Sequence, residues 1–158
     1  IYYLMTKNKY LSLVLFLLIT FAASAIGGFT TSVFKEPWYS QITLPSYNPP
    51  SWVFGPVWST LYVFMSIAIW KAWIITENKE LLKIYFLHLF FNAIWSVIFF
   101  GFHNIGLALV DLIIILLFII LLMKIYYRIS KTSFYLMVPY LIWSSYAFIL
   151  NASIFLLN

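Results

Sequence analysis

The sequence has 158 residues, of which 65% are hydrophobic, 22% aromatic and only 8% charged. A soluble domain carries roughly a quarter charged residues, so this composition excludes an ordinary water-soluble protein and a disordered chain. The lack of cysteine excludes a disulfide-stapled scaffold, and the net charge of +5 comes from too few charges to form a nucleic-acid-binding surface. The expected solvent is therefore the lipid bilayer.

Five segments are long and apolar enough to cross a bilayer, because a spanning helix needs about 20 mostly apolar residues. They cover about 10–29, 52–75, 82–100, 105–127 and 134–157. Since these segments occupy most of the chain, they predict an all-α fold, a single domain (1–158) that is a bundle of five transmembrane helices. The first segment is too long for the apolar region of a signal peptide, so we interpret it as a retained helix.

Basic residues lie unevenly along the predicted spans. With five spans, the amino terminus and the second and fourth connections share one side of the membrane. That side carries all Lys and Arg except Lys35: Lys7, Lys9, Lys71, Lys79, Lys83, Lys124, Arg128 and Lys131. The positive-inside rule then places the amino terminus inside, and the carboxyl terminus and first loop outside. Anionic membrane lipid explains the basic excess, and no nucleic-acid partner is predicted.

The first connection, predicted at 30–51, holds four of the six prolines, at 37, 45, 49 and 50. Proline limits the conformations of the unfolded segment, so this loop can become ordered at modest entropic cost. Two interpretations stand side by side. The loop is either a lid over a cavity or an interfacial aromatic belt, in which its aromatic residues sit at headgroup level. These aromatic residues are Trp38, Tyr39, Tyr47 and Trp52.

Three of the predicted helices carry a stripe of aromatic residues with an amide or hydroxyl nearby. The stripes are Trp58, Tyr62 and Met65; Asn92, Trp95 and Phe99; and Tyr140, Trp143, Ala147 and Asn151. Their spacing places each set on one helix face. The stripes are compatible with a cavity for a flat apolar ligand, or with ordinary packing in which Asn92 and Asn151 hydrogen-bond between helices.

A few polar and small residues inside the spans leave their role open. Asp111 is the only acidic residue well within a span, where a charge is costly, so it is either a proton relay or a carboxyl group bonded to a neighbouring helix. His88 and His103 have no cysteine or second acid to complete a ligand set, so no metal site is predicted. The pairs Ala23/Gly27 and Ser24/Gly28 have the spacing for close helix approach, within the bundle or at a dimer seam.

The order and spacing of several motifs resemble one known family. The motifs are Trp38-Tyr39, the segment 49–62 (PPSWVFGPVWSTLY), 91–95 (FNAIW), 98–101 (IFFG), 107–112 (LALVDL), 139–143 (PYLIW) and Leu150-Asn151. On these residues the chain resembles the tryptophan-rich sensory protein/translocator protein family, TspO, also called the peripheral benzodiazepine receptor family. The resemblance runs from about Trp38 to the end of the sequence. It implies a five-helix bundle, usually a homodimer, with a pocket beneath the first loop.

The resemblance also implies a ligand class and its contacts. Members bind tetrapyrroles such as protoporphyrin IX and drug-like apolar ligands, and no resident cofactor is expected. The ligand-binding positions that match are Tyr39, Pro49, Trp58, Tyr62, Asn92, Trp95, Trp143 and Ala147. Trp58 and Trp143 match the tryptophans implicated in porphyrin breakdown. One departure is Tyr47, where the family usually has tryptophan, which removes one indole from the expected pocket wall.

The function expected from these residues is a membrane sensor or scavenger that binds a tetrapyrrole. Indole is readily oxidised, so Trp58 and Trp143 are candidates for a redox role in light- and oxygen-dependent porphyrin degradation, with the loop limiting escape of reactive intermediates. The alternatives are a porphyrin or lipid transporter and a structural membrane partner without turnover. Against transport, the five unequal spans show no inverted repeat.

Overall fold

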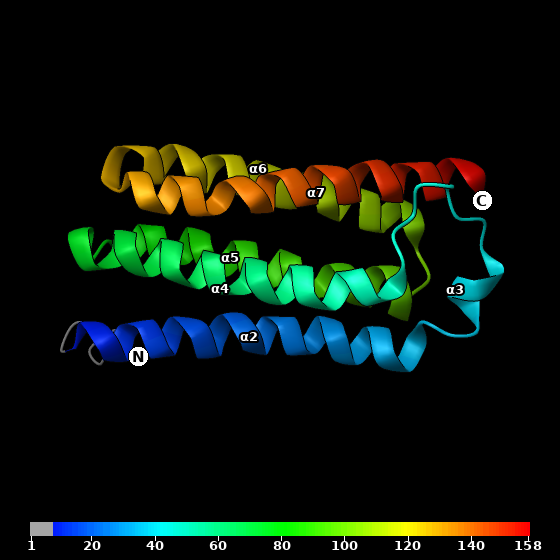
Figure 1. Cartoon of the computed structure of the whole chain (residues 1–158), viewed down its shortest axis with the longest axis horizontal. Coiled ribbons are helices and arrows are strands. Elements are labelled where there is room, and N and C mark those ends of the chain that lie inside the picture. Colours follow the sequence, from blue (N-terminus) through cyan, green and yellow to red (C-terminus); the bar gives the residue numbers. More distant parts are fainter. Residues whose placement is uncertain (1–7) are drawn as a thin grey trace.

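The computed structural model describes residues 8–158, so Lys7, one of the basic residues used for the orientation, lies outside it. Five long helices run side by side along one axis (Figure 1). They are α2 (Lys9–Phe34), α4 (Ser51–Thr76), α5 (Lys79–Ser96) with its π-helical continuation η1 (Val97–Gly101), α6 (Ile105–Ile129) and α7 (Lys131–Leu157). The described residues contain no strand, and all five helices are long and apolar enough to cross a membrane. The predicted all-α fold with five spans is confirmed.

The helices pack in a closed ring. Each helix contacts its neighbour in the order α2, α4, α7, α6, α5 and back to α2. Towards the end where the chain begins, the interior is filled by large buried side chains such as Phe16, Trp73 and Tyr126. A hydrogen bond between Thr20 Oγ1 and Tyr85 Oη (2.6 Å) ties α2 to α5 in this region. The bundle therefore has one densely packed half.

Several helices extend beyond the predicted spans. Helix α2 continues to Phe34 instead of 29, because the hydroxyls of Thr30 and Thr31 donate to the carbonyls of Ile26 and Gly27 and so stay bonded within their own helix. The loop therefore covers only 35–50. At the other helix starts, polar caps begin the helix earlier than the apolar stretch does. Asn78 caps α5 and Ser130 caps α7, each accepting a hydrogen bond from a backbone N–H of the first turn.

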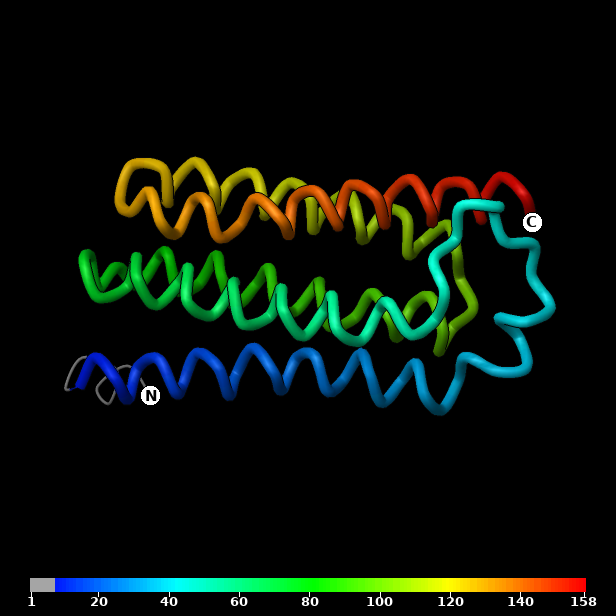
Figure 2. The backbone as a smooth tube through the Cα atoms, viewed as in Figure 1, coloured from blue at the N-terminus to red at the C-terminus, as the bar shows by residue number. Residues whose placement is uncertain are grey.

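The connection between α2 and α4 crosses the end of the bundle at which α7 ends (Figure 2). Its short helix α3 (Trp38–Gln41) packs on η1, where Trp38 stacks on His103 (ring centroids 4.5 Å apart) and meets the edge of Phe99. By contrast, 75% of the Trp52 surface is exposed. The lid interpretation therefore fits the segment around α3, and the belt interpretation fits Trp52.

The loop is also tied to the last turns of α7. The side chain of Asn158 accepts from the backbone N–H of Thr43 (2.8 Å) and donates to its carbonyl (3.0 Å). Tyr146 Oη donates to the carbonyl of Tyr47 (2.6 Å), and the Tyr47 hydroxyl bonds to Ser153. These contacts join residues about a hundred positions apart in sequence and hold the loop over the bundle.

Substitution of Asn104 by alanine is expected to lower the free energy of unfolding by about 1 kcal/mol, the usual contribution of a helix N-cap. Asn104 Oδ1 accepts from the N–H of Leu107 (2.9 Å) at the exposed start of α6. Unfolding by SDS in mixed micelles measures the change, and Asn104→Asp, which keeps an acceptor, serves as the control. Equal stability of the alanine and wild-type proteins would contradict the capping role.

Candidate functional site

A cavity of about 520 Å³ lies at the loop end of the bundle. All five long helices contribute to its wall, and the loop covers it through Tyr39 and Asn48. Ligand sites in proteins are typically clefts of about 300–1,000 Å³ lined by apolar and aromatic side chains with a few polar groups. This cavity has the size and lining of such a site.

Most of the residues expected to bind ligand from the sequence line this cavity. They are Tyr39, Trp58, Tyr62, Asn92, Trp95, Trp143 and Ala147. Pro49 does not line it. Its carbonyl instead accepts a hydrogen bond from Nδ2 of Asn48 (3.3 Å), and Asn48 does face the cavity. The structure thus brings together side chains from the loop and from three helices at one place, with Pro49 one step behind the wall.

Three indole rings form part of the wall, one each from α4, α5 and α7. Trp58 stacks on Tyr62 with ring centroids 5.7 Å apart, and Trp143 meets the edge of Phe54 at 5.9 Å. Trp95 stacks on Phe99 at 4.9 Å. The indoles are half-buried, because part of each ring faces the cavity. The wall can therefore offer aromatic surface to a flat apolar molecule.

The π-helical segment η1 helps to form this aromatic wall. It adds one residue to the helical turn, and Phe102 N–H closes it by donating to the carbonyl of Val97 (2.9 Å). Both Phe99 and Phe100 of this segment line the cavity. Single π-helical turns inside α-helices are frequent at functional sites, since they redirect side chains that a regular helix would place elsewhere.

The amides of the aromatic stripes are hydrogen-bonded between helices. Tyr62 Oη donates to Asn92 Oδ1 (2.6 Å), which joins α4 to α5. Asn151 accepts from Trp95 Nε1 (3.2 Å) and donates to the carbonyl of Ile105 (3.0 Å). Both sequence interpretations of the stripes therefore hold, because the same faces that line the cavity also carry the interhelical bonds.

Two members of the stripes lie below the cavity. Met65 and Tyr140 have no exposed surface and belong to the packed core. The N–H of Trp143 is buried without an acceptor, although the ring lines the cavity. Only the upper part of each stripe therefore faces the open space.

Sequence reasoning missed the contribution of α2. Five small or hydroxyl residues of this helix line the cavity: Ser24, Gly27, Gly28, Thr31 and Ser32. A Cβ atom added to Gly28 would meet open space, whereas one added to Gly27 would lie 3.1 Å from Ser96 Oγ of α5. The small-residue spacing therefore serves both packing within the bundle, at Gly27, and the volume of the cavity, at Gly28.

The cavity is most exposed along the seam between α2 and α4. Lining residues that keep exposed surface recur at helical spacing on both helices: Gly28, Ser32, Ser51, Gly55 and Ser59. Lys35 Nζ donates to Ser51 Oγ (3.1 Å) and so bridges the two helices at the outer end of this seam. Small side chains on both sides leave the seam open over these turns.

Tyr39 and its neighbours form the outer end of the cavity. Burial raises the pKa of the Tyr39 phenol above its ordinary value, the hydrogen bond with Asn48 opposes this effect, and the charge of Glu36 adds to it. Lys35 lies over the Tyr39 ring, with Nζ 4.9 Å from the centroid. The outer end therefore combines a neutral phenol with one cationic group.

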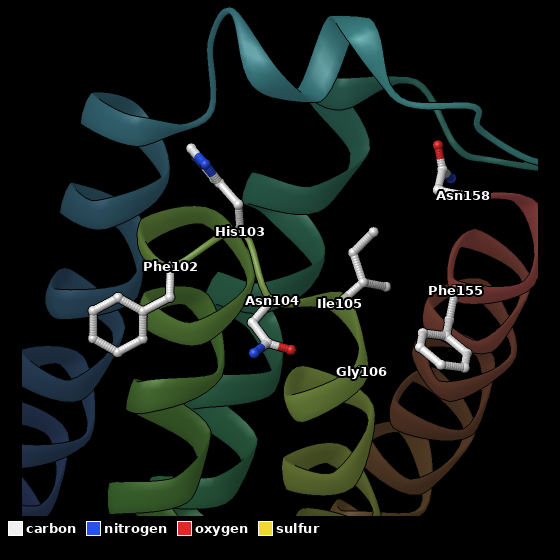
Figure 3. Close-up of a pocket in the computed structure, with 7 residues that line it drawn as sticks. All are labelled: Phe102, His103, Asn104, Ile105, Gly106, Phe155 and Asn158. Carbon is white, nitrogen blue, oxygen red and sulfur yellow. The ribbon is translucent and has the colours of Figure 1, made fainter.

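Other polar residues singled out in the sequence lie outside this cavity. Asp111 is buried, and its Oδ2 has no hydrogen-bond partner. His88 bonds to Tyr140 inside the bundle, whereas His103 lies at the loop, so the two histidines do not meet. Figure 3 shows His103 beside a shallow depression of about 320 Å³ between the start of α6 and the end of α7, with its ring turned towards the loop.

Comparison with known proteins places the chain among relatives of similar length. The sequence profile of the TspO/MBR family matches residues 15–157. The chain is 37% identical over 153 residues to the tryptophan-rich protein TspO of Archaeoglobus fulgidus, covering 94% of this chain and 97% of that protein. It is 33% identical to a tryptophan-rich sensory protein of Cereibacter sphaeroides (90% and 91% covered) and 35% identical to the human translocator protein (82% of each).

The paired glycines of α2 provide a test of the cavity wall. Gly28→Ala is expected to raise the free energy of unfolding by up to about 1 kcal/mol, the difference in helix propensity, because its methyl group meets open space. Gly27→Ala gains the same propensity but pushes against Ser96 Oγ, so it should stabilise less or destabilise. SDS unfolding of both variants gives the comparison, and equal effects would contradict the assignment of the two faces.

Proposed function

The chain belongs to the TspO/MBR family of integral, multi-pass membrane proteins, and from this premise we propose that it binds a tetrapyrrole such as protoporphyrin IX in the cavity beneath the first loop. The observation that carries the proposal is the convergence of Trp58, Trp95 and Trp143 from three helices on one cavity. A tetrapyrrole is a flat, apolar macrocycle with carboxylates on its edge, and stacked indole rings suit its faces.

The outer end of the cavity supports one orientation of the macrocycle. Lys35 lies at this end beside the hydroxyl of Ser51 and the phenol of Tyr39. The ring would occupy the aromatic part of the cavity, and its carboxylates would face Lys35, because a cation and hydroxyl donors bind carboxylates well. No resident cofactor is needed, since the tetrapyrrole is itself the ligand.

The same arrangement supports slow photochemistry on the bound ligand. The photoexcited macrocycle would accept an electron from Trp58 or Trp143 and pass it to dioxygen, which leaves an oxidised indole and superoxide. The walls exclude bulk water, and the loop, tied to α7 through Tyr47 and Thr43, limits the escape of intermediates. We propose this degradation as a secondary activity of a binding protein.

Replacement of Trp58 and Trp143 by phenylalanine should preserve binding and abolish light-driven bleaching of protoporphyrin IX. Phenylalanine keeps an aromatic face, so the affinity should change less than about tenfold, because one aromatic contact contributes about 0.5–1.5 kcal/mol. Quenching of protein fluorescence measures binding, and absorbance under illumination in air measures bleaching. Trp52→Phe, at an exposed position outside the cavity, is the matched control and should bleach like the wild type.

The outcomes separate the alternative functions. Saturable quenching without flux through reconstituted vesicles supports a sensor or scavenger, whereas saturable porphyrin flux favours a transporter. Absence of saturable quenching leaves only a structural role and contradicts the proposed ligand. Unchanged bleaching in the double phenylalanine variant contradicts the redox role of the two tryptophans but not binding.

We also propose that the amino terminus lies inside and the loop and carboxyl terminus outside, from the distribution of basic residues. The chain has no native cysteine, so single cysteines report topology directly. Ser46→Cys in the loop should react with a membrane-impermeant maleimide on intact cells, whereas Thr132→Cys, at the exposed start of α7, should react only after permeabilisation. The opposite labelling pattern would reverse the orientation.

A further inference from the structure

A buried tyrosine–histidine pair lies directly behind the cavity wall. Tyr140 of α7 and His88 of α5 have no exposed surface, and Tyr140 Oη lies 2.7 Å from His88 Nε2. Neither residue lines the cavity, and neither has a role in the binding proposed above. A histidine in this position costs helix-packing energy in an apolar bundle, so its purpose needs an explanation.

The hydrogen bonds around the pair fix where the phenol proton lies. Asn92 Oδ1 accepts from Tyr62, so its Nδ2 donates to Tyr140 Oη (2.8 Å). The Tyr140 oxygen is thereby an acceptor, and its own proton finds an acceptor in His88 Nε2. If Nε2 carried a proton instead, both the phenol proton and the unpartnered Nδ1 of His88 would lack a partner. The network therefore favours the arrangement in which Tyr140 donates to the imidazole.

The pair is also in contact with the proposed redox site. The Trp58 ring meets the Tyr140 ring edge-on, with centroids 6.2 Å apart. Tyr62 stacks on the same indole, but its hydroxyl donates to an amide oxygen, which is a very weak base. An oxidised phenol is a strong acid and must lose its proton, so only the tyrosine bonded to an imidazole can be oxidised easily. This chemistry distinguishes Tyr140 from Tyr62.

We propose that Tyr140 and His88 form a relay that returns an electron to oxidised Trp58 and holds the oxidising equivalent outside the cavity. The inference rests on the proposed photochemistry, in which the excited tetrapyrrole removes one electron from Trp58 and passes it to dioxygen. The oxidised indole then takes one electron from Tyr140, and the phenol proton moves to His88 Nε2. The products of this step are neutral Trp58, a neutral tyrosyl radical and an imidazolium. The two residues act through Trp58 and do not touch the ligand.

The relay is tested by the radicals that form in the intact chain loaded with protoporphyrin IX and illuminated in air. Electron paramagnetic resonance and transient absorption should detect a tyrosyl radical in the wild type. Tyr140→Phe should lose this radical and lengthen the lifetime of the indole radical about tenfold or more, equivalent to about 1.4 kcal/mol in the barrier. Tyr135→Phe, at an exposed position on the same helix, should match the wild type.

The role of the imidazole has its own variant and readout. His88→Gln keeps a side chain of similar length but replaces the imidazole nitrogen with a weaker base, so the tyrosyl radical should form more slowly. In deuterated buffer, decay of the indole radical should slow in the wild type and lose this isotope dependence in the glutamine variant. Fluorescence quenching by protoporphyrin IX checks that each variant folds and binds before its radicals are compared.

The results distinguish failure of the relay from failure of the proposed function. Normal bleaching with an unchanged tyrosyl radical in Tyr140→Phe overturns the relay and leaves binding and photochemistry standing. Saturable binding without bleaching or any radical in the wild type overturns the photochemical proposal, and the relay with it. If a variant fails to fold, the wild-type isotope effect still decides, because its absence contradicts proton transfer within the pair.

Discussion

The architecture of this bundle depends on the hydrogen bonds of Asn92. In hydrocarbon no water can satisfy a polar side chain, so a buried amide must bond to neighbouring helices or destabilise the fold. Asn92 accepts from Tyr62 of α4 and donates to Tyr140 of α7, while its own backbone belongs to α5. One side chain thus joins three helices just below the cavity and sets the distance at which their aromatic faces stand.

Below this amide the interior is solid, and above it the bundle is hollow. The difference follows from side-chain size. Large residues such as Phe16, Met65 and Trp73 fill the ring of helices at one end, whereas glycine and serine on α2 leave space at the other. Polar cross-links that hold the helices apart at fixed spacing allow an open volume to persist without collapse, which dense aliphatic packing would not.

The sequence predicted the elements better than the contacts between them. Apolar length and helical spacing are local properties, so five spans and the inward faces carrying Trp58 and Trp143 could be recognised in advance. The role of Gly28 in the wall could not, because a small residue carries no sign of what it faces. The continuation of α2 through Thr30 was missed for a different reason, since polar hydroxyls that bond within their helix resemble a helix end in the sequence.

Nonlocal contacts were equally beyond prediction. The bonds between Asn158 and Thr43, and between Tyr146 and Tyr47, join distant segments and depend on the final geometry of the bundle. The extra residue in η1, which helps to bring Phe99 and Phe100 to the wall, likewise has no signature in an apolar run. These features become evident only when the helices are placed together. One of them has mechanical importance. Helix α7 supplies Trp143 to the wall and at its far end grips the loop, so any occupant that tilts this helix would also pull on the outer surface, where another molecule could detect the difference between a filled and an empty bundle.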